Sequence, residues 1–265
     1  MSDGLGGRYL HGHHDSVLSS HRWRTVENSA AYFAAVVEAD FRILDVGCGP
    51  GTITAGLAAL VPEGAVIGID RSAEVIAEAK IAAPTADFVV ADLMALGIGS
   101  RSVDAVHLHQ VLQHLVDPVG ALGEVARVLV PGGVLAARDS DYSAMSWSPA
   151  DPRLDTWLEL YRAAARSLGA EPDAGPQLEG WARAAGFEDV EVSVTNWVYE
   201  TPEERRWWGS LWADRMTKSA LASTILEASL ATPDDLAELA RAWREFSTAL
   251  VGRFEVPCTE ILARR

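Results

Sequence analysis

The expected fold is decided by one stretch of sequence, Ile43-Leu44-Asp45-Val46-Gly47-Cys48-Gly49-Pro50-Gly51. Residues 42–46 are a short apolar run, which is typical of a buried strand, and the run ends at Gly47. Glycines at positions 47, 49 and 51 then lead into residues 52–60, whose pattern is typical of a helix. Glycines let the backbone bend sharply and let a ligand approach it closely. We therefore predict a strand–turn–helix unit that holds a nucleotide-like ligand.

Strand-like and helix-like segments alternate on both sides of this turn. Such alternation is typical of parallel strands with helices on both faces of the sheet. Ligands of these sheets bind at the carboxyl ends of the strands. We predict an α/β, Rossmann-like, mostly parallel sheet of seven strands, with strands at 42–46, 65–69, 87–91, 103–108, 134–137, 190–194 and 254–263 and with helices at 52–60, 73–82 and 119–129, the last ended by Pro131-Gly132-Gly133.

The pattern changes after residue 141, where long helical stretches separate the last two strands. We predict a single domain over residues 1–265 in which these helices form a cap over the cofactor edge. The first parts are an N-terminal helical lid over 1–38, with a helix from Val26 to Glu38, and a cofactor-binding core over 40–141. Helical cap insertions follow over 142–175 and 200–250. The late helix and strands of the core lie over 176–199 and 251–265.

Composition narrows the class of partner. The net charge of −15 and the pI of about 4.8 disfavour a nucleic-acid substrate, because an acidic surface repels phosphates. The two cysteines, Cys48 and Cys258, are too few for a disulfide framework. No stretch has the length and apolar character of a signal region or a membrane span. We therefore expect a soluble, cytoplasmic protein with no membrane partner.

The spacing of the glycines indicates which ligand the turn holds. A dinucleotide site has the pattern Gly-x-Gly-x-x-Gly and places a pyrophosphate on the helix. Here the third glycine, Gly51, comes one position early, and Asp45 stands two residues before the first. A carboxylate there suits an ammonium group better than a pyrophosphate. S-adenosylmethionine carries an ammonium and a sulfonium and no phosphate, so the turn favours this methyl donor over NAD.

Acidic residues end the next two predicted strands. Asp70 is placed to accept hydrogen bonds from the two hydroxyls of a ribose. Asp92 is placed to accept the amino group of adenine, with the N–H of Leu93 offered to the ring. The alternative is that each carboxylate caps the helix that follows it. Together with Asp45, the acids stand at three successive strand ends, which favours one shared ligand.

In this order the motifs resemble those of class I S-adenosylmethionine-dependent methyltransferases, most closely the ubiquinone- and menaquinone-biosynthesis type. The resemblance covers roughly residues 40–140 and rests on residues 43–51, 68–70, 91–93, 111–115 with Asp117-Pro118, and 129–133. It implies S-adenosylmethionine as cofactor and S-adenosylhomocysteine as product. The cofactor-binding residues that it implies are Asp45, Gly47, Cys48, Gly49, Asp70, Arg71, Asp92, Leu93, His109, Gln110 and His114.

A second resemblance involves the N-terminal residues 9–14, 20–24 and 27–30. They are similar to a bacterial subset of the family that methylates small molecules of secondary metabolism, including the carbon of indole rings. This resemblance implies a small, aromatic acceptor that is methylated on C, N or O. It does not fix the substrate.

Histidines are the candidates for proton transfer. Methyl transfer aligns a nucleophile, a methyl group and sulfur in a dry pocket, and a weakly acidic acceptor also needs a general base. We expect His13, His14 or His109 in this role, because histidine titrates near neutral pH. A metal site at His11-x-His13-His14 is disfavoured by its spacing and by the lack of a supporting carboxylate or cysteine set. The further alternative is a folded lid with hydrogen-bonded histidines.

The acceptor half of the site is expected in the cap. Eight of the nine tryptophans follow residue 146, and most of them are expected to pack between helices. Trp207 and Trp208 are adjacent, so they cannot share one helix face, and one of them is expected to meet a ligand or another subunit. Residues 139–142 follow the fifth predicted strand and point to the same edge, so we expect them to offer hydrogen bonds to the substrate; the alternative is a loop that only caps a helix. The residues that we predict to bind the acceptor are Tyr9, Asp139, Tyr142, Trp197 and Trp208.

Two other functions stay open from the residues alone. One is an NAD-type oxidoreductase, which Asp45 and the position of Gly51 disfavour. The other is a nucleoside-binding module without activity. A homodimer also stays open, because an N-terminal lid often contributes contacts between subunits.

Overall fold

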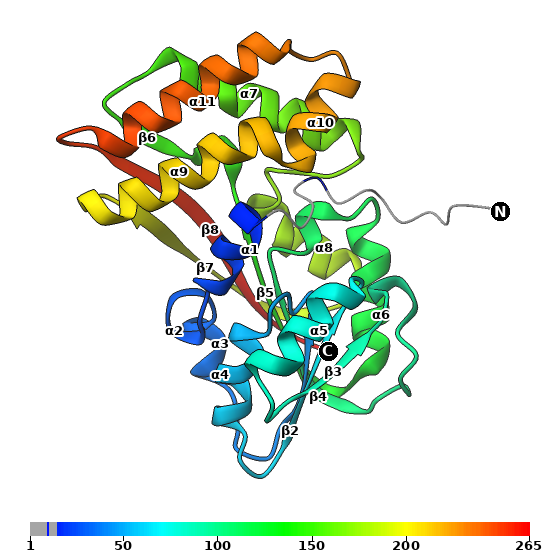
Figure 1. The fold of residues 1–265 in the computed structure, drawn as a ribbon. Coiled ribbons are helices and arrows are strands. Elements are labelled where there is room, and N and C mark those ends of the chain that lie inside the picture. Colours follow the sequence, from blue (N-terminus) through cyan, green and yellow to red (C-terminus); the bar gives the residue numbers. More distant parts are fainter. Residues whose placement is uncertain (1–9, 11–14) are drawn as a thin grey trace.

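A computed structural model describes residue 10 and residues 15–265, and a mixed sheet of eight strands forms its centre (Figure 1). The strand order is β3-β2-β1-β4-β5-β8-β6, and β7 pairs with β8 off this path. Neighbours from β3 to β5 are parallel, whereas β5, β6 and β7 each run antiparallel to β8. The strands are β1 Arg42–Val46, β2 Ala65–Asp70, β3 Asp87–Val90, β4 Val103–His109, β5 Leu129–Ser140, β6 Ser146–Ser148, β7 Glu188–Tyr199 and β8 Arg253–Arg264.

Helices cover both faces of the parallel part, as the alternation predicts. On one face, α4 (Thr52–Leu60) buries Leu57 against the strand residue Ile43 and against Phe33 of the N-terminal segment. On the other face, α6 (Pro118–Val128) and α8 (Leu178–Ala184) bury Leu122 and Leu178 in a second cluster. The helix α5 (Ala73–Ala82) packs beside β2 and β3. The carboxyl ends of β1, β2 and β4 therefore stay accessible at one edge.

Four further helices pack together at the top of Figure 1. We call α7 (Pro152–Ser167), α9 (Pro202–Lys218), α10 (Ala220–Glu227) and α11 (Pro233–Thr248) the helical layer. Its core is aromatic, because the ring of Trp157 lies 4.5 Å from that of Trp212 and 4.8 Å from that of Trp243. In residues 10 and 15–265, none of the helices combines the length and apolar character needed to cross a membrane.

The two late strands connect the sheet with the helical layer. Each has 12 residues, which is longer than the predicted 190–194 and 254–263. They pair with each other almost from end to end, and Figure 1 shows them running up from the sheet to α9. The short strand β6 adds an eighth strand to the predicted seven, and β5 starts at Leu129, directly after α6, so that Pro131-Gly132-Gly133 lies inside the strand.

The N-terminal segment differs from the single helix that we predicted over 26–38. It forms α1 (Asp15–Arg22), α2 (Val26–Ser29) and α3 (Ala31–Ala34), with a break at Ala30. The indole N–H of Trp197 donates to the backbone oxygen of Asn28 at 2.9 Å, and that oxygen would bind the N–H of Tyr32 in a continuous helix. A contact made by β7 therefore takes the place of a helical hydrogen bond.

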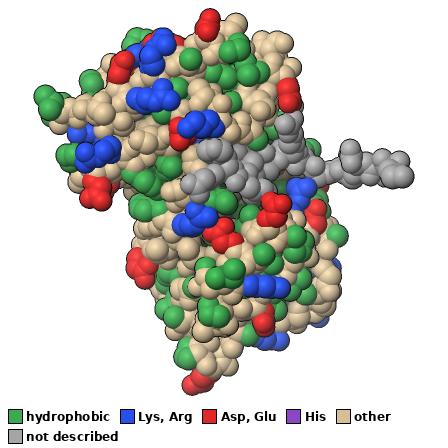
Figure 2. Space-filling view, viewed as in Figure 1, with side chains coloured by type: hydrophobic (Ala, Val, Ile, Leu, Met, Phe, Trp, Pro, Cys, Tyr) green, Lys and Arg blue, Asp and Glu red, His purple; other side chains and the backbone are tan. Residues whose placement is uncertain are grey.

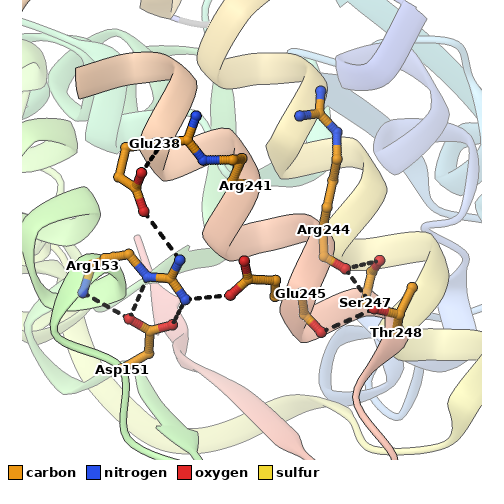
Figure 3. Close-up of polar contacts among 8 residues, drawn as sticks. All are labelled: Asp151, Arg153, Glu238, Arg241, Arg244, Glu245, Ser247 and Thr248. Atoms are coloured by element: carbon orange, nitrogen blue, oxygen red, sulfur yellow. Dashed lines mark hydrogen bonds and ion pairs between the residues drawn. The ribbon is translucent and has the colours of Figure 1, made fainter. Parts of the chain in front are cut away.

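A polar network fastens the start of α7 to α11 (Figure 3). Arg153 donates to Asp151 at 2.7 Å, to Glu238 at 3.1 Å and to Glu245 at 2.6 Å. Arg241 binds the same Glu238 from within α11. The network holds two helices of the helical layer in a fixed relation at its surface.

Replacing Arg153 by methionine is expected to lower the free energy of unfolding by roughly 1 kcal/mol, because it removes ion pairs to two elements at once. Urea denaturation at low and high salt measures the effect, and high salt should reduce it. The control is Arg183→Met, which breaks one exposed pair with Glu179 and should cost roughly 0.3–0.5 kcal/mol. Equal losses in the two variants would contradict the role of the network.

Candidate active site

A cavity of about 440 Å³ lies between the carboxyl ends of β1, β2 and β4 and the helical layer. Figure 2 shows the surface stepping inward on the left at this level, below the helical layer. Three parts of the chain line the cavity: the glycine turn and strand ends, the N-terminal residues from Val17 to Arg24, and the helical layer with β7. The volume falls within the range of small-molecule sites.

The glycine turn has the backbone that its sequence predicts. Gly47 adopts a φ of +65°, which is the left-handed region that favours glycine. A Cβ atom on Gly47 would lie 2.5 Å from Cγ2 of Val111, so no larger residue fits without a shift. The N–H of Cys48 donates to the carbonyl of Ile69 at 2.9 Å, which ties the turn to β2. The bare backbone of the turn lines the cavity and leaves room for a ligand.

Asp45 is buried at the base of the turn and lines the cavity. The hydroxyl of Thr54 donates to one carboxylate oxygen at 2.5 Å. Nδ1 of His107 lies 2.7 Å from the other. The carboxylate is therefore held in one orientation by α4 and β4. His107 has no exposed surface, and sequence reasoning missed it because its pairing with Asp45 depends on strand register.

Asp70 joins the glycine turn to the start of α5. One of its oxygens accepts from the N–H of Gly49 at 3.2 Å, and the other accepts from the N–H of Ser72 at 2.9 Å. The side chain is half-buried and lines the cavity. It therefore makes local hydrogen bonds and also faces the space in which a ligand would lie.

Asp92, Leu93 and Arg71 meet at the next strand ends and line the cavity. Asp92 accepts from the N–H of Met94 at 2.9 Å, which is the capping role that we kept as the alternative. Its carboxylate also lies 3.9 Å from the guanidinium of Arg71, and both side chains are about half exposed. The pair leaves the carboxylate accessible from the cavity.

A buried network closes the floor of the cavity at the end of β4. Gln110 has a φ of +57°, and its N–H donates to the carbonyl of Arg138 at 2.7 Å. Its side-chain oxygen accepts from the amide of Gln113 at 2.8 Å and from the hydroxyl of Ser140 at 2.8 Å. Sequence reasoning named Gln110 as a cofactor residue and Ser140 within the stretch 139–142, but it did not single out Gln113, which lies three residues after Gln110. Only the pairing of β4 with β5 brings Ser140 to Gln110.

His109 and His114 line the cavity as neutral groups. Burial and the nearby charges of Arg24 and Arg138 hold the pKa of His109 well below its usual range. Burial, with Arg24, lowers the pKa of His114 to about 3. The ring of His109 lies 5.6 Å from that of Trp197. Both imidazoles are therefore uncharged at neutral pH.

The opposite end of the cavity is aromatic. Tyr142, Trp197, Tyr199 and Trp208 line it together with Met145 and Val256. The rings of Tyr199 and Trp208 stack at 4.2 Å. Tyr142, Trp197 and Trp208 were predicted for this end, whereas Tyr199 and Met145 were missed because long-range pairing places them.

The N-terminal segment covers this end of the cavity. Arg215 of α9 is buried, lines the cavity, and donates to the carbonyl of Ser16 at 3.0 Å and to the hydroxyl of Ser20 at 2.6 Å. Arg22 pairs with Glu78 of α5 at 2.6 Å. The segment is thereby tied to both the helical layer and α5. The predicted Tyr9, His13 and His14 lie outside the described residues.

Asp139 is placed away from the cavity wall. It is fully buried, and one of its oxygens accepts from the N–H of Gln113 at 3.5 Å. Its neighbours Arg138 and Ser140 point to the other face, because side chains alternate along β5. The described residues that line the cavity do not include Asp139, which we had predicted to bind the acceptor.

The buried carboxyl of Asp139 should make stability depend on pH. Burial raises its pKa from 3.8 to about 7, so the folded state holds an extra proton between these values. Stability that depends on this group is therefore lost as pH rises from about 4 to about 7. Urea denaturation across that window should show a free energy of unfolding that falls with rising pH in the wild type. Asp139→Asn should lack this fall. An identical pH dependence in both proteins would contradict the assignment.

Comparisons with known proteins agree with this geometry. Residues 44–137 match the family model described as a methyltransferase domain. The chain is 35% identical to an uncharacterized methyltransferase of Schizosaccharomyces pombe, over 80% of either chain. It is 32% identical to the demethylmenaquinone methyltransferase of Roseiflexus castenholzii, over 61% of this chain and 66% of that one. The solved structure of the YcgJ protein of Bacillus subtilis shares the fold, with a TM-score of 0.57 and 20% identity over 89% of this chain and 96% of that one.

Proposed function

This chain belongs to the class I S-adenosylmethionine-dependent methyltransferases, and we propose that it methylates a small aromatic acceptor. One observation carries the proposal: a single cavity runs from the glycine turn to a wall of four aromatic side chains. A donor at one end would meet a planar acceptor at the other, in a space closed by the N-terminal segment.

The residues at the turn fit the cofactor, S-adenosylmethionine. The turn offers bare backbone to the cavity at Gly47 and Gly49, so no side chain stands between the backbone and a ligand. Asp70 and Asp92 present carboxylates to the cavity at successive strand ends. We propose that Asp70 holds the ribose, that Asp92 and Leu93 hold the adenine, and that Asp45 lies near the ammonium group. When bound, the cofactor supplies an electrophilic methyl group on a sulfonium.

The aromatic end fits a planar acceptor. Tyr142, Trp197 and Trp208 offer flat apolar surfaces to the cavity, and such surfaces also favour a cationic sulfonium nearby. Indoles and hydroxylated aromatic rings, including quinols, are acceptors of this shape. We propose methylation of such a compound on C, N or O, as in secondary metabolism.

The chain's own residues would align the donor with the acceptor, exclude water and accept the proton that the acceptor loses. Trp23 packs against Trp197, Tyr199 and Trp207, which closes the N-terminal segment over the aromatic end. Alignment in a dry site can supply much of the rate of a displacement. His109 lines the cavity, and we propose it as the group that accepts a proton from a weakly acidic acceptor.

Transfer of a labelled methyl group tests the proposed function. Purified protein is incubated with methyl-labelled S-adenosylmethionine and a panel of indoles, phenols, quinols and, for contrast, aliphatic polycarboxylates. We expect label in at least one planar aromatic compound and none in the polycarboxylates. Binding of S-adenosylhomocysteine without transfer to any aromatic compound would instead favour a nucleoside-binding module.

Replacing Trp208 by leucine is expected to raise the KM for the aromatic acceptor roughly tenfold, because a flat contact surface is lost. The dissociation constant of S-adenosylhomocysteine should not change. The matched control is Trp181→Leu, whose side chain packs against α6 and the opposite face of the sheet and should leave KM unaltered. An unchanged KM in Trp208→Leu would remove Trp208 from the acceptor site.

A further inference from the structure

The charges that line the cavity differ between its two ends. Among the described lining residues, every acid stands at the glycine turn or a strand end, namely Asp45, Asp70 and Asp92. The lining arginine at that end, Arg71, lies 3.9 Å from Asp92. The aromatic end carries Arg24 of the N-terminal segment and Arg215 of α9. Asp and Glu outnumber Lys and Arg by 37 to 22 in the whole chain, so positive charge at the aromatic end runs against the composition.

Arg24 presents a guanidinium to the aromatic end from the N-terminal segment. Its Cζ atom lies 5.3 Å from the centroid of the Trp197 ring, a cation–π contact that holds the side chain against the aromatic wall. The residue is half-buried and lines the cavity, so a ligand can reach it. A guanidinium whose face rests on a ring keeps N–H groups at its edge for hydrogen bonds.

Arg215 brings a second guanidinium to the same end from α9. Only 4% of the residue is exposed, and its Cζ atom lies 4.8 Å from the centroid of the Trp212 ring and 6.0 Å from that of Trp208. Its Nη2 donates to the carbonyl of Ser16 at 3.0 Å and to the hydroxyl of Ser20 at 2.6 Å. Both oxygens are neutral, so these two bonds orient the guanidinium without cancelling its charge.

The two arginines act on the same part of the cavity. Burial raises the pKa of the Tyr142 phenol, whereas the charges of Arg215 and Arg24 lower it. Burial also raises the pKa of the Tyr199 phenol, against the charges of the same two arginines. Both tyrosines line the aromatic end. Charges from two elements far apart in the sequence therefore meet at these tyrosines.

We propose that the aromatic acceptor carries a carboxylate, and that Arg24 and Arg215 bind this group at the aromatic end of the cavity. The inference rests on the proposed function, because it names the substrate class of the same site. It narrows the planar aromatic compounds to aromatic acids. The acids at the glycine turn would then attract the cationic donor, while the two arginines would select the acceptor and fix its orientation.

A carboxylate matches a guanidinium in both charge and shape. Its two oxygens accept parallel hydrogen bonds from the planar fork of an arginine, and such charge-assisted bonds are about twice as strong as neutral ones. A guanidinium as buried as that of Arg215 gains most from an anion, because little water screens the pair. Trp197 and Trp208 lie beside the two guanidiniums and offer the flat surfaces on which the ring of the same molecule would lie.

Matched pairs of acids and amides test the proposal without altering the protein. The probes are 4-hydroxybenzoate with 4-hydroxybenzamide, and indole-3-carboxylate with indole-3-carboxamide. Each is titrated by calorimetry into the full-length protein saturated with S-adenosylhomocysteine. An amide keeps the shape of the acid and loses its charge, so we expect the acid to bind roughly 10- to 100-fold more tightly in at least one pair. Equal or weaker binding of the acid in both pairs, or no binding of either acid, would overturn the proposal.

Variants then locate the anion site. Arg24→Gln and Arg215→Gln should each lose most of the preference for the acid, whereas Arg24→Lys should keep part of it because a point charge remains. The matched control is Arg22→Gln. Arg22 belongs to the same segment, pairs with Glu78 at 2.6 Å and is not among the described residues that line the cavity, so its variant should keep the wild-type preference. A full preference in Arg24→Gln or in Arg215→Gln would contradict a site shared by the two arginines.

The ratio of the two affinities separates anion binding from a structural role. Arg215 also fastens α1 to α9 through Ser16 and Ser20, so its loss is expected to loosen the N-terminal segment. Loosening alone would weaken the binding of acid and amide alike, and a ratio left at the wild-type value would overturn the proposal.

Transfer assays distinguish failure of this inference from failure of the proposed function. Methylation of neutral aromatic compounds as readily as of the matched acids would refute the inference and leave the proposed function standing. Absence of transfer to any aromatic compound would refute the proposed function, and the affinity ratio of acid to amide would still decide the inference.

Discussion

Replacing Asp70 by alanine is expected to weaken the binding of S-adenosylhomocysteine by about 1–3 kcal/mol, the cost of losing charge-assisted hydrogen bonds. Two effects add in this variant. The carboxylate now binds the N–H groups of Gly49 and Ser72, so its loss loosens the glycine turn. It also faces the cavity where the ribose hydroxyls would lie. Isothermal titration calorimetry of the full-length protein measures the loss.

A matched control separates the site from the general acidity of the protein. Asp104 is an acid on β4 that pairs with Arg42 at 2.8 Å, and it does not line the cavity. Asp104→Ala should leave the affinity for S-adenosylhomocysteine unchanged. If Asp70→Ala bound the ligand as tightly as Asp104→Ala does, Asp70 would have no part in the cofactor site.

Replacing Glu260 by glutamine is expected to lower the free energy of unfolding by about 3–5 kcal/mol, because it leaves the buried guanidinium of Arg138 without a charged partner. Glu260 and Arg138 are nearly fully buried, and their nitrogen and oxygen atoms lie 3.0 Å apart. The hydroxyls of Ser193 and Thr195 complete the hydrogen bonds of the carboxylate at 3.0 and 2.6 Å. Urea denaturation monitored by tryptophan fluorescence measures the change.

The double variant Arg138→Met with Glu260→Gln should recover much of that loss, because no buried charge is left unpaired. The exposed pair of Arg42 and Asp104 gives the comparison, since Asp104→Asn should cost no more than about 1 kcal/mol. A Glu260→Gln variant as stable as Asp104→Asn would show that Arg138 finds another way to satisfy its charge.

The cofactor half of the site could be predicted from sequence because its signals are local. The glycine turn needs a strand before it, a helix after it and left-handed backbone at Gly47, all of which lie within 20 residues or so of sequence. Asp70 and Asp92 follow strands that their own apolar runs reveal. The alternation of strands and helices then predicts that these residues meet at one edge.

The rest of the site depends on pairings that no local pattern shows. Asp45 meets His107 only through the register of β1 with β4, and Gln110 meets Ser140 only through β4 and β5. The lengths of β7 and β8 follow from their pairing with each other, so alternation within either strand underestimates them. The single helix predicted after Thr25 was wrong because Trp197 takes the backbone oxygen of Asn28.

The directions in which successive residues of a helix point predicted part of the acceptor half of the site. Adjacent tryptophans cannot face the same way, and the structure buries Trp208 at the cavity while Trp207 packs against Trp23 and Tyr199. The same reasoning does not apply to strands whose pairing is unknown, so Tyr199 was missed. The catalytic roles predicted for His13 and His14 stay predictions, because these residues lie outside the described part of the chain.

The central claim is that one cavity brings the methyl donor and an aromatic acceptor together. A crystal structure with S-adenosylhomocysteine and the best acceptor from the panel tests it most directly. We predict the nucleoside against the glycine turn and Asp70, the acceptor ring among Tyr142, Trp197 and Trp208, and the sulfur facing the acceptor atom near His109. An acceptor bound outside this cavity, or a nucleoside away from the glycine turn, would contradict the account.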